Sequence, residues 1–113
     1  MKAEAQLLKG HLDTLLLATL EAGPLHGYAV MEALRQAGGS RFDLPTGTIY
    51  PALRRLEAAG LLDGNWSVVG GRKRRTYALT AAGCHKLSGD RAAWRDFATT
   101  VTSILQARPC PAT

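Results

Sequence analysis

The chain holds few of the residues on which metal, disulfide and redox sites depend. Cysteine occurs only twice in 113 residues, as Cys84 and Cys110, and neither lies in a CxxC motif. His85 follows Cys84 directly, but the side chains of adjacent residues diverge on a helix and do not share one ion. We therefore expect two unpaired thiols in a reducing compartment, with no metal and no cofactor.

Long apolar runs and a secretion pattern are also missing. No apolar stretch approaches the roughly 18 to 20 residues that a membrane helix needs. The N-terminus lacks a basic segment followed by an apolar one and a small-residue cleavage site. We expect a cytoplasmic protein that enters no membrane. The chain also shows no carboxylate pair, nucleophile–base set or phosphate loop, so we do not expect an enzyme.

Apolar residues make up 46% of the chain, which is enough for one folded domain with a modest core. Its formal net charge is +5, and much of the excess is clustered. Between positions 41 and 75 the basic residues are Arg41, Arg54, Arg55, Arg72, Lys73, Arg74 and Arg75, against the acids Asp43, Glu57 and Asp63. Such a cluster favours a polyanionic partner, nucleic acid first and an anionic membrane surface second.

Apolar spacing predicts three helices, over residues 7–22, 28–37 and 46–59. In the first, Leu8, Leu12, Leu15 and Leu16 share a face, and further leucines spread apolar surface round most of the helix. A helix of that kind is buried on more than one side. We expect the helices to end at Gly23-Pro24, Gly38-Gly39 and Gly60.

After the third helix the apolar period changes to two, which predicts a β-hairpin. One strand has Leu62, Trp66 and Val68 on one face, and the next has Arg75, Tyr77 and Leu79. The segment GGRK joins them as a glycine turn with a basic tip. Thr80 then caps a last helix of about 25 residues.

Three helices followed by a hairpin make a winged helix-turn-helix. The expected fold is therefore mainly α with a small β-hairpin, followed by a long C-terminal helix. We assign residues 1–79 to a DNA-binding domain, 80–107 to a dimerisation helix and 108–113 to a flexible tail.

The third helix has two different faces. Ile49, Leu53 and Leu56 lie within roughly 40° of one another, at 100° per residue, and form the core side. The opposite side holds Gly47, Pro51, Arg54, Arg55 and Ala58. A proline is tolerated in the first turn, where amides have no intrahelical partner. Pro51 should therefore set the helix start at about Gly47 or Thr48, with a threonine as cap.

This outward face suits the major groove of DNA, because its midline is smooth and arginines flank it. Alone, Arg54 and Arg55 could equally form a solvated helix face; the surrounding helices and basic hairpin favour DNA. Tyr28 is either a core aromatic residue or a phosphate ligand. The predicted DNA-binding residues are Tyr28, Thr46, Thr48, Tyr50, Pro51, Arg54, Arg55, Arg72, Lys73, Arg74 and Arg75.

Three stretches carry a family resemblance: LLKGHLDTLLLATLEAGPLHGYAV, GTIYPALRRLEAAGLL and GGRKRRTYALTAAG. Their motifs are G-P-x-H-G-Y at 23–28 and G-T-I-Y-P-x-L-x-R-L-E at 47–57. From about Leu7 to Leu105 the chain resembles the PadR family of bacterial transcriptional regulators, in its short form with one C-terminal helix. The resemblance implies a homodimeric winged-helix repressor on a roughly palindromic operator, released by a small molecule. Ala29 and Ala93 stand where family members commonly carry an acid.

Dimerisation is also expected from apolar residues that one small domain does not obviously cover. The predicted interface residues are Leu7, Leu8, Leu12, Trp94, Phe97, Val101 and Ile104. A two-fold dimer would place two third helices on an inverted repeat of double-stranded DNA. Trp94 and Phe97 are either plain interface aromatics or the stacking surfaces of a pocket for a planar effector. The rival function is a winged helix that contacts only protein, with Arg54 and Arg55 docking an acidic partner.

Overall fold

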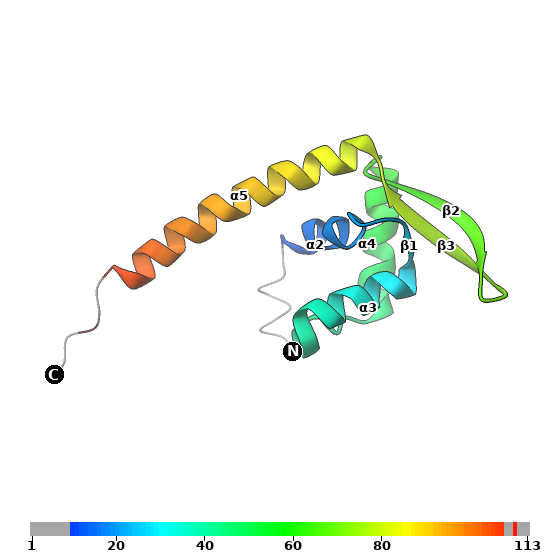
Figure 1. The fold of residues 1–113 in the computed structure, drawn as a ribbon, viewed down its shortest axis with the longest axis horizontal. Coiled ribbons are helices and arrows are strands. Elements are labelled where there is room, and N and C mark those ends of the chain that lie inside the picture. Colours follow the sequence, from blue (N-terminus) through cyan, green and yellow to red (C-terminus); the bar gives the residue numbers. More distant parts are fainter. Residues whose placement is uncertain (1–9, 108–109, 111–113) are drawn as a thin grey trace.

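The computed structural model describes residues 10–107 and residue 110. Its elements, in chain order, are α2 (Leu12–Thr19), β1 (Leu25–His26), α3 (Gly27–Gly38), the 3-10 helix η1 (Gly39–Phe42), α4 (Thr46–Ala58), β2 (Leu62–Val69), β3 (Arg72–Leu79) and α5 (Ala81–Gln106). Figure 1 shows the three short helices packed together, the hairpin projecting from one end and α5 extending away on the other. The winged helix-turn-helix with a long last helix is confirmed.

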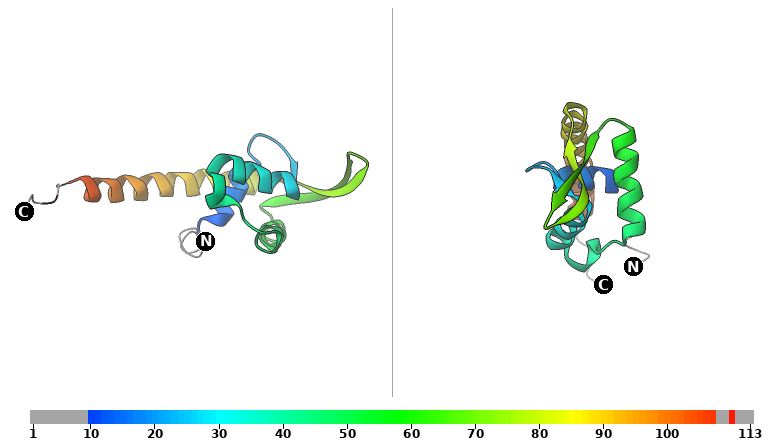
Figure 2. Two further views of the ribbon diagram at one scale, coloured as in Figure 1. Left: turned by 90° about the horizontal axis from the view of Figure 1, so that it is seen from below. Right: turned by 90° about the vertical axis from the view of Figure 1, so that its right-hand side faces the viewer.

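The core lies where α2, α3 and α4 meet. Leu16, Leu17, Val30, Ile49 and Leu53 are all completely buried, because each helix turns its apolar stripe inward. Leu56 is buried as well, so the predicted core side of the third helix is confirmed. The opposite side of α4 faces away from the body of the protein, as the side view in Figure 2 shows.

The hairpin forms as predicted, with one strand added. Gly70 and Gly71 make a two-residue turn, both with positive φ (58° and 77°), as a tight hairpin requires. The short β1 pairs with β3, which gives a three-stranded sheet in the order β1-β3-β2. The alternation of apolar residues did not predict β1, because two residues are too few to show a period.

The first helix is shorter than its apolar pattern suggests. Within the described residues, α2 begins at Leu12, since Gly10 has a left-handed backbone (φ 87°), and it ends at Thr19 rather than at Gly23. The continuous helix predicted over 7–22 is therefore wrong at Gly10. Leu7 and Leu8 lie outside the described residues. Leu12 packs partly against the core of its own chain.

The segment between α3 and α4 contains the 3-10 helix η1. Gly39, with φ of 65°, ends α3 as predicted. Gly38 has to lack a side chain, because a Cβ there would meet the Phe42 ring at 2.0 Å. Phe42 and Leu44 pack partly against the core, so this segment contributes to the fold.

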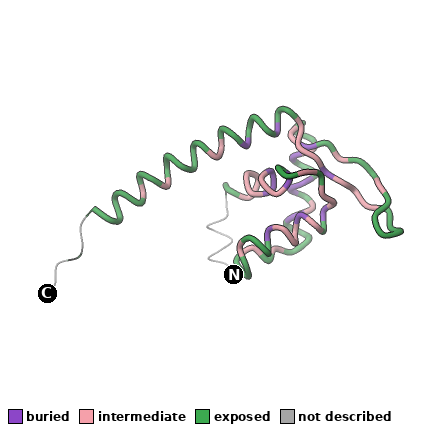
Figure 3. The backbone as a smooth tube through the Cα atoms, in the orientation of Figure 1, coloured by how far each residue is buried: buried purple, intermediate pink, exposed green. Residues whose placement is uncertain are grey.

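Only the first part of α5 is anchored to the domain. Thr80 caps the helix as predicted: its hydroxyl accepts the Gly83 amide at 3.0 Å and donates to the Gly60 carbonyl at 2.7 Å. Leu87 is buried against the core. Beyond it the helix is mostly exposed along its length, as the burial colouring in Figure 3 shows. No helix among the described residues is long and apolar enough to cross a membrane.

Candidate nucleic-acid interface

The start of α4 differs from the predicted one. Pro45 occupies the N-cap, with no side-chain hydrogen bond, and its carbonyl accepts the amides of Thr48 at 2.9 Å and Ile49 at 3.2 Å. The predicted threonine cap is wrong. Because the helix begins at Thr46, Pro51 is its sixth residue and lies just past the first turn. Its missing N–H therefore leaves the Gly47 carbonyl without the usual i+4 partner.

The exposed face of α4 carries most of its predicted contacts. Thr46, Gly47, Thr48, Pro51, Arg54, Arg55 and Ala58 are exposed, and Tyr50 is half-buried. An added Cβ at Gly47 would meet nothing within 4 Å, so the start of the helix is open to a close-fitting partner. Small residues at the front and arginines further along give this face a smooth midline with charged flanks.

The two adjacent arginines have different partners. Arg55 forms an ion pair with Asp13 of α2. Arg54 forms no ion pair with any residue in the described part of the chain. Arg54 is thus available to an external anion, whereas Arg55 would have to leave Asp13 or share it. The sequence alone could not distinguish them, because Asp13 is 42 positions away.

The basic residues of the wing (β2, β3 and their turn) also divide into paired and unpaired groups. Arg75 forms an ion pair with Glu57 of α4. Arg72, Lys73 and Arg74 form none with the residues described here. Arg72 and Lys73 are exposed next to the turn, while Arg74 is half-buried. Three unpaired cations therefore lie along the end of β3 that is nearest the tip.

A groove of about 520 Å³ lies between α4, the N-terminus of α3 and the wing. Residues that line it include Tyr28, Tyr50, Arg54, Lys73, Arg74 and Arg75, all predicted as DNA contacts. His26, Gly27, Glu57, Trp66 and Tyr77 complete the lining. Six of the eleven predicted contacts are brought together here; Thr46, Thr48, Pro51, Arg55 and Arg72 lie outside the groove.

Two of the three tyrosines that line the groove, Tyr28 and Tyr77, differ in burial. Tyr28 is 50% exposed, so it is not a core aromatic. A hydrogen bond to Glu32 raises the pKa of the Tyr28 phenol, and the hydrogen bond from Arg35 lowers the pKa of the Glu32 carboxyl. Tyr77 is buried, and burial raises the pKa of its phenol, with the charge of Glu57 adding to the effect. His26 caps α3 by accepting the Ala29 amide at 3.3 Å.

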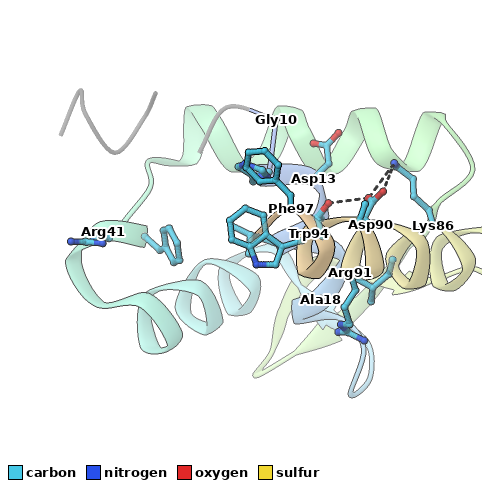
Figure 4. A pocket seen from close by; sticks show the side chains of 15 residues that line it. Gly10, Asp13, Ala18, Arg41, Lys86, Asp90, Arg91, Trp94 and Phe97 are labelled. Atoms are coloured by element: carbon cyan, nitrogen blue, oxygen red, sulfur yellow. Dashed lines mark hydrogen bonds and ion pairs between the residues drawn. The ribbon is translucent and has the colours of Figure 1, made fainter. Parts of the chain in front are cut away.

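A second groove, of about 710 Å³, lies on the other side of the domain between α2 and α5. Figure 4 shows Trp94 and Phe97 side by side on its wall. Their ring centroids are 6.3 Å apart, and the His11 ring meets Trp94 edge-on at 5.1 Å. Asp90 on the same wall accepts a hydrogen bond from Thr14 at 2.9 Å and pairs with Lys86 at 3.2 Å. The two predicted pocket residues thus line a real groove.

Three residues that complete these surfaces were not predicted: Asp13, Glu57 and Trp66. The pairing of Trp66 with Arg75 was implicit in the sequence. A two-residue turn at Gly70-Gly71 fixes the register, so Val69 opposes Arg72 and Trp66 opposes Arg75. Asp13 and Glu57 had no comparable pattern, since their partners come from other elements.

Neither cysteine is in a disulfide, as predicted: Cys84 and Cys110 are free and exposed. No group of three or more metal-binding side chains occurs among the residues that the structure describes.

Comparison with known proteins gives concordant matches. The profile of the transcriptional regulator PadR-like family matches residues 16–89. The chain is 42% identical over 77 residues to the transcriptional regulator Rv3488 of Mycobacterium tuberculosis, a match that covers 68% of this chain and 69% of that protein.

Solved structures agree. A PadR family transcriptional regulator from Eggerthella lenta superposes with a TM-score of 0.79 at 32% identity, over 92% of this chain and 89% of the other. A PadR-like transcriptional regulator from Bacillus cereus gives a TM-score of 0.80 at 30% identity, over 89% and 97%.

Proposed function

This chain belongs to the PadR-like family of transcriptional regulators, as its motifs predicted, and on that premise we propose a homodimeric repressor that a small molecule releases from an inverted-repeat operator. It is a DNA-binding regulator and not an enzyme. Its dimeric state, its operator, repression, effector and cytoplasmic location are the proposed part.

One observation supports the assignment of the DNA surface. The groove between α4 and the wing is lined by Arg54, Lys73 and Arg74, and none of the three has a carboxylate partner within the described residues. Unpaired cations that converge on one groove suit a phosphate backbone. The exposed face of α4 would then enter the adjacent major groove.

The test is a gel-shift salt series on the promoter DNA of the gene that encodes this protein. If the dimer makes about 6 to 10 phosphate contacts, affinity should fall about 10³- to 10⁵-fold between roughly 50 and 200 mM salt. For the groove variant Arg54→Ala, the matched control is Arg95→Ala, because Arg95 is an exposed arginine on α5 outside the groove. A flat salt dependence would refute the electrostatic part of the proposal.

We assign dimerisation to α5, with residues 1–79 as the DNA-binding part. Phe97 is 62% exposed and Ile104 69%, although both belong to the apolar row that begins at Trp94. A row of large apolar side chains on a projecting helix indicates a protein interface. A second copy, packed about a two-fold axis, is the partner that the family favours.

The effector site is proposed for the groove at Trp94 and Phe97. Its volume lies within the roughly 300 to 1,000 Å³ that is typical of ligand pockets. Two neighbouring rings suit a flat aromatic molecule. Quenching of Trp94 fluorescence by planar compounds tests this, with Trp66→Phe removing the other tryptophan; no quenching across a broad panel would leave Trp94 as an interface residue only.

A further inference from the structure

The wing carries an exposed tryptophan with two cations close to its ring. Trp66 is 61% exposed, which is unusual for so large an apolar side chain on a small domain. The Lys73 Nζ lies 5.6 Å from the centroid of its ring and the Arg75 Cζ lies 5.5 Å from it. Both distances are within the roughly 6 Å at which a cation is attracted by an aromatic face.

The strand register explains why the three side chains meet. Trp66 is paired with Arg75, and Lys73 is paired with Val68, the next residue but one along β2. Because paired residues project to the same face of an antiparallel sheet, Trp66, Lys73 and Arg75 all point to one side. That side lines the groove next to α4.

The inner end of this cluster is anchored to α4. Arg75 forms its ion pair with Glu57, whose side chain lies against Gly64 of β2. A Cβ at Gly64 would come within 2.8 Å of the Glu57 carboxylate, so the glycine makes room for it. The cluster therefore joins the Glu57 carboxylate to the Arg75 guanidinium, and the indole ring to both the Arg75 guanidinium and the Lys73 ammonium.

Arg75 and Lys73 differ in whether a carboxylate of the same chain already binds them. Arg75 already has a carboxylate, whereas Lys73 has none in the described part of the chain. Two cations at i and i+2 on one strand face repel each other. The indole offsets that repulsion and restricts a lysine that would otherwise sample many rotamers.

We propose that Trp66 is a positioning residue that holds Lys73 at the groove for a DNA phosphate, with Arg75 as the internal support of the wing and not a DNA contact. This rests on the proposed DNA binding. It assigns a role to Trp66, and it predicts that the four consecutive basic residues of the wing are not equivalent.

The experiment measures binding of the full-length protein to a fluorescein-labelled random-sequence duplex of about 30 base pairs, long enough for two half-sites one turn apart. Random DNA is suitable, because a phosphate contact does not depend on sequence. Fluorescence anisotropy gives the affinity of the wild type, Trp66→Leu, Lys73→Ala and the double variant. Trp66→Phe keeps an aromatic face, and Val68→Ala shortens the next exposed apolar residue on the same strand face.

Trp66→Leu should weaken binding about three- to ten-fold, and Trp66→Phe should restore most of the loss. Lys73→Ala should weaken binding similarly and lower the salt slope by about 1.8, because the proposed dimer would lose two phosphate contacts, one from each protomer. In the Trp66→Leu background, Lys73→Ala should cost less than about two-fold, because a lysine that is no longer held contributes little. Val68→Ala should leave binding unchanged.

A Lys73→Ala cost that is equal in both backgrounds would overturn the proposal, and would show that the indole contacts DNA itself. Equal losses for Val68→Ala and Trp66→Leu would also overturn it, in favour of a general apolar contact.

NMR of the DNA-free protein separates this proposal from the proposed function. In the wild type, the Lys73 side-chain CH₂ protons should be shifted upfield by the indole ring, and Trp66→Leu should return them to ordinary values. Unshifted protons would rule out the held lysine whether or not the protein binds DNA. Shifted protons in a protein that fails to bind any duplex would instead overturn DNA binding, and with it this use of Lys73.

Discussion

The protein has two grooves with opposite chemistry. Arg54, Lys73 and Arg74 line the groove between α4 and the wing, without a carboxylate partner in the described residues. The groove between α2 and α5 is lined by aromatic rings, and its carboxylates Asp13 and Asp90 are each already bound by a cation. Of the arginines and lysine in its lining, Arg41 alone has no carboxylate partner in the described residues. Where the carboxylates are paired within the chain, the apolar rings are the surface that is left for a ligand. Where the cations have no carboxylate partner, they are left to bind an anion.

The largest effect should come from placing charge on the apolar row of α5. Phe97→Glu combined with Ile104→Glu should weaken the proposed dimer by about 3 kcal/mol or more, roughly 100-fold, because each residue is buried twice per dimer. Light scattering over a dilution series measures this. Thr99→Glu is the matched control, since Thr99 lies on the opposite side of the same helix. A double variant that remains dimeric at low micromolar concentration would place the interface elsewhere.

The next effect distinguishes the two adjacent arginines. Arg54→Ala should weaken operator binding by about 1 to 3 kcal/mol, because Arg54 is unpaired. Arg55→Ala should cost less, since Arg55 is already held by Asp13. Gel-shift titrations of both variants at one salt concentration provide the comparison. If Arg55→Ala is the more damaging, Arg55 must leave Asp13 or be shared between Asp13 and DNA when DNA binds.

Pro51, on the exposed face of α4, allows the free energy of unfolding and DNA binding to be compared in one variant. Pro51→Ala should raise the free energy of unfolding by about 1 to 2 kcal/mol, less than the ~3 kcal/mol of a mid-helix proline, since it restores the hydrogen bond to Gly47 near the helix start. Urea denaturation measures the gain. Weaker DNA binding by this more stable variant would indicate that Pro51 is kept for its contact, and unchanged stability would mean that the helix start relaxes around the proline.

The smallest effect is a pH dependence of the folding stability that the Glu21–Arg91 ion pair contributes. Arg91 donates to Glu21 at 2.7 Å and 3.0 Å, and this hydrogen bonding lowers the pKa of the Glu21 carboxyl below its ordinary 4.5. Since the folded pKa is the lower one, the stabilisation is present above about pH 4.5 and is lost as the pH falls through the folded value. Glu21→Gln should therefore lower the Tm slightly at pH 7. The difference from wild type should vanish in acid, and a difference that persists there would indicate a packing effect.

The sequence predicted most of α4 and the wing for physical reasons that act locally. Ile49, Leu53 and Leu56 repeat at helical spacing, so their burial followed from the period alone. Gly70-Gly71 between two alternating segments indicated the turn and, with it, the strand register. The threonine cap predicted for α4 was wrong, because the helix begins one residue after Pro45, whose side chain makes no cap hydrogen bond. The first helix was predicted too long because Gly10 interrupts a run of otherwise helix-compatible residues.

The sequence by itself determined α3, α4, the hairpin and α5, together with the basic third and the apolar row of the last helix, because periodicity, glycine turns and net charge are properties of nearby residues. Only the tertiary structure decided which charges remain available. Asp13 binds Arg55, which is 42 positions away in the sequence, and Glu57 binds Arg75, which is 18 positions away. Such pairs depend on how helices and strands pack against each other, and no local pattern records them. The distinction between a basic residue that is paired within the fold and one that is left without a carboxylate partner in the described residues therefore came from the packing alone.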